Sequence, residues 1–516
     1  MDSLKRIKNN AQLTEDIEML KGLHVPTRIN YIIDQRGEII NSASMVSNCF
    51  TLNADGTKHY VSGNTGAKDG NIAENLLVWL RANTHAYYGV YDTIKKTMTL
   101  KPLSDTNRRM FADGTSSATA ITNGTTETES SDVWIKFPCD IYWKSTTKIP
   151  GETEEDANRI MVTITTKLEE GEDEKDWCKW SQYDLVAVYK ACIIGNAIYS
   201  RSGHLQCNYK SIEDFKTMAN NRGNAFKIVP YEFRVLIALL SYPWYHTLDV
   251  QGQVGWGTKM AYNNAIDNYV KKTGINDKYG MTDTTPTTGC GTATEAESIA
   301  GEGPNIRGAN YYGFEEPWNG IEEILGNIRI MGLEKPENAS VVDAKREYIS
   351  VWFTEDSNFS VICDTYYTDD LYDESSNPIE RRKTCTALSD FKGHGNTNYV
   401  YVGIFDYDNK LVRCIEIPKS RFVSNWMKKV ALGVQFDLII IDGATNSTVQ
   451  HNYYQSYQLA RDVPGTVVTG GGAHNDCNGG INNLYMYRNK SLDGWYKVAG
   501  TRLVFLGTKD TIKIID

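Results

Sequence analysis

The sequence predicts an α+β protein in which strands dominate. Apolar and polar residues alternate in many short runs, which is typical of strands with one buried face. A few segments instead show helical spacing or helix caps. Helices and strands do not alternate in the βαβ rhythm of a parallel sheet, and no internal repeat of fixed period is found. The second half of the chain is the richer in predicted strands.

The composition excludes several classes of protein. The chain has 516 residues, of which 41% are hydrophobic and 23% charged, as in ordinary soluble globular proteins. This length suggests about three domains. The net charge of −10 repels a phosphate backbone, and the richest basic stretch, Lys5–Asn10, is short, so we expect no nucleic-acid partner. Ten cysteines without a CxxC pair predict reduced, mostly structural thiols.

The sequence predicts no membrane insertion. Residues 1–10 are polar where a secretory signal would become apolar. The longest apolar run, Phe233–Tyr245, is too short to cross a bilayer and contains Pro243. We therefore expect synthesis in a cytosol.

The first predicted element is a helix within residues 1–23. Its apolar residues, among them Leu4, Ile7, Ile17 and Leu20, follow three- and four-residue spacings with one slip. An isolated helix this short is not stable in water. It either docks on its own domain or packs against copies of itself or a larger assembly. We favour the second, and assign residues 1–30 to anchoring or oligomerisation.

Residues 31–130 are expected to form a small mixed α/β module. Residues 71–83 have a helical pattern, and strand patterns occur at 31–34, 86–91 and 97–103. The segment Asp113–Asp132 is polar and rich in Ser and Thr, which is typical of a loop or linker. We place a domain boundary there and assign residues 131–516 to one larger domain with long loops.

The larger region contains two predicted helices and many strands. Ser211 and Asp214 form a capping-box pattern that predicts a helix ending near Gly223, and Pro230 opens a second, buried helix. Residues 280–313 are too rich in Gly and Thr for a packed element, and such a long loop is normally functional or mobile. Strand patterns occur at 133–144, 159–168, 348–354, 399–407, 411–417, 436–442 and 503–507.

No catalytic or metal-binding frame is found. The P-loop, GxGxxG, HExxH and GxSxG frames are absent from the sequence. His474 and Cys477 are three residues apart but have no second pair nearby to complete a metal site. The acidic clusters at 368–374 and 405–410 lack EF-hand spacing, and exposed acidic turns explain them better. We therefore predict no enzymatic activity and assign no catalytic residue or metal ligand. The sequence leaves open whether the protein holds a structural calcium ion.

The segment Gly470–Lys490 is polar and rich in Gly and Asn, although the predicted buried strand at 503–507 follows it closely. It carries two of the 31 tyrosines of the chain, which has only 14 phenylalanines. Tyrosine combines a rigid apolar ring with a polar tip, which suits contact surfaces. It also suits the rim of a β-rich core, and the composition alone leaves both interpretations open.

Three segments, in order, resemble the formylglycine-generating-enzyme branch of the C-type lectin fold. Phe215–Leu239 is similar to the paired helices of that branch, Asn310–Ile330 to its "N-x-[FY]-G-L-x-D-[ML]-x-G-N-V-W-E-W" segment, and Val467–Gly507 to its closing strands. The matching positions of the last two segments are Gly313, Phe314, Gly326, Asn327, Gly470, Gly471, Gly472, Gly500, Arg502 and Leu503. The resemblance covers about 133–516 and implies a C-type lectin-like fold there.

The chain also resembles tailed-bacteriophage and prophage proteins. The stretches that carry this likeness are Asp184–Gly203 and Gly433–Ile441. Some such proteins are the variable targets of diversity-generating retroelements, in which the ribbon between the double glycine and the last strand contacts the ligand. The enzymes of the lectin-type branch need two reactive cysteines near the C-terminus. Here Cys477 stands alone after Cys414, so formylglycine chemistry is not expected.

The resemblance implies that the ribbon binds a ligand. Asn offers adaptable donors and acceptors, and Tyr offers rigid contact area. The expected ligand-binding residues are His474, Asn475, Asn478, Asn483, Tyr485, Tyr487 and Asn489, with Trp495 and Tyr496 at the edge. As alternatives, Tyr485 and Tyr487 share one face of a strand packed on the core, and Asn482–Asn483 is only a turn.

The implied function is that of a non-enzymatic virion protein, of the fibre or tail-tip type, made in the host cytoplasm. It would recognise a host-surface glycan or protein and attach to other virion proteins through residues 1–30. A homo-oligomer, with a trimer favoured, would offset weak binding at each site by avidity. The alternative is a purely structural virion protein that uses the lectin-type fold for subunit packing.

Overall fold

The computed structural model describes part of the chain. The described residues are 27–34, 49–52, 58–59, 72–115, 131–146, 159–245, 250, 254, 273–274, 276–284, 308–318, 321–332, 348–353, 361–367, 382–385, 399–407, 411–418, 425–432, 438–444, 457–459, 465–469, 484–486 and 499–515. The helix expected within 1–23, the acidic cluster 368–374 and most of the linker 113–132 lie outside these ranges.

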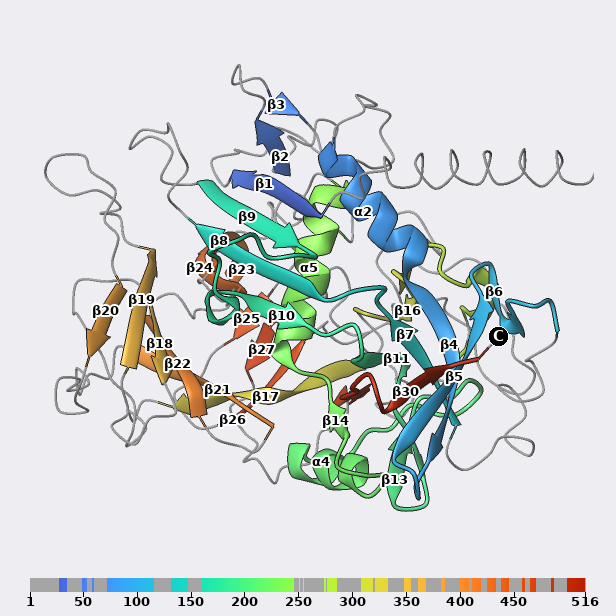
Figure 1. Cartoon of the computed structure of the whole chain (residues 1–516). Helices are drawn as coiled ribbons and strands as arrows, with labels where there is room; N and C mark the ends of the chain where they lie inside the picture. The colour runs from blue at the N-terminus through green and yellow to red at the C-terminus, as the bar shows by residue number, and fades with distance from the viewer. Residues whose placement is uncertain are drawn as a thin grey trace, which may run out of the picture.

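The described residues form several mainly antiparallel sheets and three α-helices, so the α+β prediction is confirmed at this level (Figure 1). The helices are α2 (Ile72–Asn83), α4 (Ile212–Asn220) and α5 (Tyr231–Tyr245), each where the sequence predicts one. The predicted capping box opens α4: Ser211 Oγ accepts from the amide of Asp214, and the Asp214 carboxylate accepts from the amide of Ser211, each at 3.0 Å. Within the described part of the chain, no helix is long and apolar enough to span a membrane.

One sheet of eight described strands joins the early, middle and closing parts of the chain. Its order is β14 (Phe226–Ile228), β29 (Arg502–Phe505), β11 (Leu185–Lys190), β7 (Ser131–Lys136), β4 (His85–Asp92), β5 (Thr97–Ser104) and β30 (Ile512–Ile514), with β6 (Asn107–Phe111) beside β5. The predicted closing strand is β29, and β30 runs parallel to β5. Strand pairing crosses the expected boundary near residue 130, because β4 pairs with β7.

Both faces of this eight-stranded sheet are buried. Val133 and Ile135 of β7 lie in one apolar cluster with residues of α2 and α5. Trp134, between them, lies in a second cluster with Phe215 of α4 and Phe505 of β29. The alternation follows from the two-residue period of a strand. The sheet therefore separates two cores, and α4 covers the second.

A second sheet, of six described strands, packs on α5. Its order is β10 (Cys178–Trp180), β8 (Ile141–Thr146), β9 (Arg159–Thr165), β1 (Arg28–Asp34), β2 (Cys49–Leu52) and β3 (Lys58–His59). Tyr31 Oη donates to the carbonyl of Leu239 at 2.9 Å, and the rings of Trp180 and Phe233 lie 5.0 Å apart. Figure 1 shows α5 running through the middle of the molecule behind β8 and β10.

The third sheet has twelve described strands and contains those predicted at 348–354, 399–407, 411–417 and 436–442. Its order is β20 (Arg382–Cys385), β19 (Val361–Tyr367), β18 (Tyr348–Phe353), β22 (Leu411–Pro418), β21 (Tyr399–Phe405), β17 (Glu322–Gly332), β26 (Gly465–Thr469), β27 (Leu484–Met486), β25 (Tyr457–Leu459), β23 (Asn425–Leu432) and β24 (Leu438–Ala444). The strand β28 (Ala499–Gly500) runs parallel to β17. The strand β17 joins this sheet to the rest, since the amide of Gly326 donates to the carbonyl of Val229 at 2.9 Å.

A buried polar cluster holds the two described ends of the 280–313 segment. Arg108 Nε donates to Asp277 Oδ1 at 3.2 Å, and Ser202 Oγ donates to the same carboxylate at 2.6 Å. Asn310 Nδ2 donates to the carbonyls of Gly280 and Thr282 at 3.1 and 2.7 Å. The remaining short elements are β12 (Cys192–Ile194) with β13 (Ala197–Tyr199), β15 (Asn310–Tyr311) with β16 (Phe314–Glu315), and the 3-10 helices η2 (Glu174–Asp176) and η4 (Asp277–Tyr279).

Candidate ligand-binding sites

The strand β17 anchors both flanks of the predicted ligand-binding ribbon. On one side, Thr469 of β26 pairs with Glu323; on the other, Gly500 of β28 pairs with the same residue. The segment between Thr469 and Gly500 therefore begins and ends beside the same residue of β17. Residues 470–483 and 487–498 lie outside the described ranges.

One of the nine expected ligand-binding residues is described. Tyr485 lies in β27, opposite Val468 of β26 and Leu459 of β25. Tyr485 therefore lies in a strand that is paired on both sides. The other eight expected residues lie outside the described part of the chain: His474, Asn475, Asn478, Asn483, Tyr487, Asn489, Trp495 and Tyr496.

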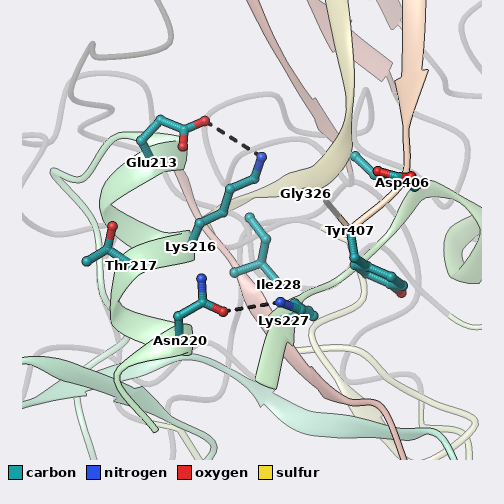
Figure 2. A pocket seen from close by; sticks show the side chains of 10 residues that line it. Glu213, Lys216, Thr217, Asn220, Lys227, Ile228, Gly326, Asp406 and Tyr407 are labelled. Carbon is teal, nitrogen blue, oxygen red and sulfur yellow. Dashed lines mark hydrogen bonds and ion pairs between the residues drawn. The ribbon is translucent and has the colours of Figure 1, made fainter. Parts of the chain in front are cut away.

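A pocket that the sequence did not predict lies between α4 and the end of β21 (Figure 2), and we call it the α4–β17 pocket. Its volume is about 130 Å³. One wall is the polar face of α4, with Glu213, Lys216, Thr217 and Asn220. The floor and the other wall come from Lys227, Ile228, Gly326, Asn327, Asp406 and Tyr407. Figure 2 shows Ile228 between the helix and the Asp406–Tyr407 wall.

The floor depends on a close approach of two strands. A Cβ atom on Gly326 would lie 2.6 Å from Cγ1 of Ile228, so any other residue here would require the Ile228 side chain to shift. Asn327 accepts from the amide of Tyr231 at 2.7 Å and donates to Glu232 at 2.6 Å, which ties β17 to the start of α5. Gly326 and Asn327 are two of the positions at which the sequence resembles the lectin-type branch. In this structure Gly326 allows β14 and β17 to pack closely, and Asn327 ties β17 to α5.

Two partly buried cations contact the carboxylate of Glu213; Lys216 lines the pocket, whereas Arg329 is not among its lining residues. Lys216 Nζ lies 3.6 Å from Glu213 Oε1, and an Arg329 terminal nitrogen lies 3.4 Å from the same oxygen. The guanidinium of Arg329 also lies 4.7 Å from the ring centroid of Phe405. Burial, and after it the positive charge of Arg329, lower the pKa of Lys216 to about 8, against the opposing effect of Glu213.

The opposite part of the pocket is polar and open to solvent at Tyr407. Lys227 Nζ donates to Asn220 Oδ1 at 3.3 Å (Figure 2). Tyr407 is 39% exposed, although it borders the pocket. Within the described residues, no group of three or more His, Cys, Asp or Glu side chains is placed to hold a metal ion. The arrangement suits hydrogen bonding to a small polar ligand.

The spacing of the α4 residues was the available sequence signal for this pocket. Glu213, Lys216, Thr217 and Asn220 follow the i, i+3, i+4, i+7 pattern of one helix face. A helix face exposed to solvent has the same pattern. The pocket could therefore not be predicted without knowing where β17 and β21 lie. A search of family models and a search of curated proteins each found no match to this chain.

Proposed function

We propose that this chain is a non-enzymatic virion protein of a tailed phage, which recognises a host-surface glycan or protein through a C-type lectin-like domain. The proposal rests on the resemblance of three sequence segments to the lectin-type branch. Further support comes from their meeting in space. The strand β14 pairs with β29, Asn327 contacts Tyr231, and Arg502 Nε lies 3.0 Å from Glu323 Oε2.

The observation that carries the proposal is the anchoring of both flanks of residues 470–498 on one strand. A display segment needs ends that are fixed by the scaffold, so that its own side chains are free for contact. Thr469 and Gly500, both opposite Glu323, provide such ends. Eight of the nine expected ligand-binding residues lie between these ends and outside β27, and Tyr485 lies within it.

Binding of the full chain to host cells and to a glycan array tests this proposal. Replacement of Asn483, Tyr485 and Tyr487 by alanine together is expected to weaken binding at least tenfold, because contact area and hydrogen bonds are lost. Ile94→Ala serves as the control, since Ile94 is 91% exposed in the turn between β4 and β5. Unchanged binding by the triple variant contradicts the assigned residues.

Electron microscopy of the virion separates this function from the structural alternative. Under the proposal, residues 470–498 face solvent at a tip of the particle. If these residues are instead covered by neighbouring subunits, the chain is a packing component and the recognition proposal fails.

A further inference from the structure

Three buried side chains lie where both flanks of the predicted ligand-binding ribbon meet β17. They belong to Glu323, Thr501 and Arg502, and each residue is at most 1% exposed. We propose that these three side chains are positioning residues, which fix the register of the flanks on β17 and thereby set where the ribbon presents its contact residues. The consequence for the ligand rests on the proposed function, whereas the register of the flanks does not.

Backbone pairing alone holds each flank weakly. On one side two residue pairs form, beginning at Thr469, before the ladder between β26 and β17 is interrupted after Ile324. On the other side β28 comprises only Ala499 and Gly500. So short a ladder specifies register weakly, and most weakly where alanine and glycine offer no large side chain to pack. The register of the flanks therefore depends on neighbouring side chains.

The carboxylate of Glu323 connects both flanks to the core. Thr469 and Gly500 pair with the backbone of this residue, so a movement of Glu323 moves both flanks. Its side chain is held by Arg502 at 3.0 Å and by Arg234 of α5 at 3.8 Å. Burial alone would raise the pKa of Glu323, but the positive charges of Arg502 and Arg234 outweigh burial and lower this pKa below its usual range. The carboxylate is therefore ionised at neutral pH.

The guanidinium of Arg502 is itself held from several directions. Besides its ion pair, it donates to the carbonyl of Ala187 in β11 at 3.0 Å and to the carbonyl of Glu315 in β16 at 2.9 Å. A guanidinium presents its donors in one rigid plane, so one orientation satisfies this set of acceptors. Arg502 follows Gly500 by two residues, and its fixed position therefore sets the position of β28.

Thr501 supplies a second link between the closing flank and β17. Its Oγ1 donates to the carbonyl of Ile324 at 3.0 Å, and its own carbonyl accepts from the amide of Ala191 at 2.8 Å. A slip of the flank by one residue, about 3.3 Å, breaks the first bond and separates Arg502 from Glu323. A charge left buried without its partner is costly, so these side chains select one register.

A role in stability alone does not explain this ion pair. Removing two charges from water costs about as much as their attraction returns, and apolar residues of similar volume often stabilise a fold equally well. An ion pair differs from apolar packing in its directional contacts, which distinguish one register from the next. Fixing a register is therefore the role that the geometry of Glu323 and Arg502 suits.

Hydrogen exchange of the full chain, followed by mass spectrometry, tests the register assignment. Thr501→Val removes only the hydroxyl and is expected to accelerate amide exchange within 499–501 about fivefold, as the loss of one ordinary hydrogen bond predicts. Thr501→Ser keeps the hydroxyl and is expected to exchange like the parent chain. Arg502→Lys keeps the charge without the planar set of donors, so it is expected to accelerate exchange within 465–469 and 499–501 at least tenfold.

The amides of β8 and β9 are the internal reference, and Arg222→Lys is the matched control. Arg222 is also buried and lies 2.5 Å from a carboxylate, that of Asp132, but this partner belongs to β7, which neither flank joins. Parent-like exchange of the flanks in Thr501→Val and Arg502→Lys overturns the assignment. Acceleration that is equal in β8 and β9, or that Arg222→Lys reproduces, also overturns it, because a general loss of stability then explains the effect.

Binding of the same variants to host cells tests the consequence for the ligand. Flanks that sample several registers leave a smaller fraction of the ribbon competent to bind. Thr501→Val and Arg502→Lys are therefore expected to bind at least threefold more weakly, and Thr501→Ser like the parent chain. Faster exchange of the flanks with unchanged binding overturns the positioning role. Absence of binding by the parent chain overturns the proposed function instead, and the exchange measurements still decide the register.

Discussion

At the scale of single residues, the structure uses buried polar groups to join distant strands. Arg502 is almost completely buried, and its guanidinium donates to Glu323 at 3.0 Å and to the carbonyl of Glu315 at 2.9 Å. The sequence singled out Arg502 only through a family resemblance, and Glu323 was not singled out. Nothing local marks a charge as buried until its partner is known, because an ion pair is assembled by the tertiary fold.

The carboxyl group of Asp184 gives a prediction about pH. Burial raises its pKa from 3.8 to about 6, and the amide of Gly507 donates to it at 3.1 Å. The folded state therefore binds this proton more tightly than the unfolded state. The stabilisation of the folded state by this bound proton is fully present below about pH 4, and it is lost as the pH rises through about 6.

Asp184→Asn is therefore expected to stabilise the protein at pH 7 by about 1–3 kcal/mol and to flatten its stability between pH 4 and 6. The asparagine carbonyl can still accept from Gly507. Urea unfolding at several pH values measures the difference. Parallel pH profiles for the two proteins would contradict the assigned titration.

At the scale of elements, the helices were the most predictable part of the fold. The capping pattern at Ser211, the apolar spacing of 71–83 and the position of Pro230 are local, and α4, α2 and α5 form where they occur. Strand positions could also be predicted from alternation. Their partners could not, since the pairing of β30 with β5 or of β28 with β17 joins residues far apart in the sequence.

The cap of α4 carries a prediction for this helix. Ser211→Ala removes the side-chain acceptor for the amide of Asp214 and is expected to destabilise the protein by about 1 kcal/mol. Faster hydrogen exchange should be confined to the first turn of α4. Ser211→Thr keeps a hydroxyl and serves as the control. Equal exchange in the alanine and threonine variants would show that the cap contributes nothing.

At the scale of the whole molecule, early and late segments of the chain depend on each other. The strands β4 and β5 fill the space between β7 and β30, and Tyr91, Met98 and Leu100 from these early strands lie in one core with Phe505. The polar stretch 113–132 resembles a linker in composition. Composition cannot reveal that the strands before and after it share a sheet.

A fragment comprising residues 131–516, the larger domain expected from the sequence, is therefore expected to lose cooperative unfolding, because it lacks β4 and β5 and leaves the edges of β7 and β30 without partners. Thermal unfolding followed by near-ultraviolet circular dichroism, with the full chain as reference, checks this. A sharp transition in the fragment would instead support the separate module expected over 31–130.

The position of Thr469 and Gly500 on either side of Glu323 also bears on how the segment between them can change. Entry and exit are set by backbone pairing that does not depend on which side chains lie between. Doubling the length of a closed loop costs only about 0.6 kcal/mol of chain entropy. Foreign peptides inserted after residue 470 should therefore lower the free energy of unfolding only slightly. This position is one at which the sequence can vary without loss of the fold.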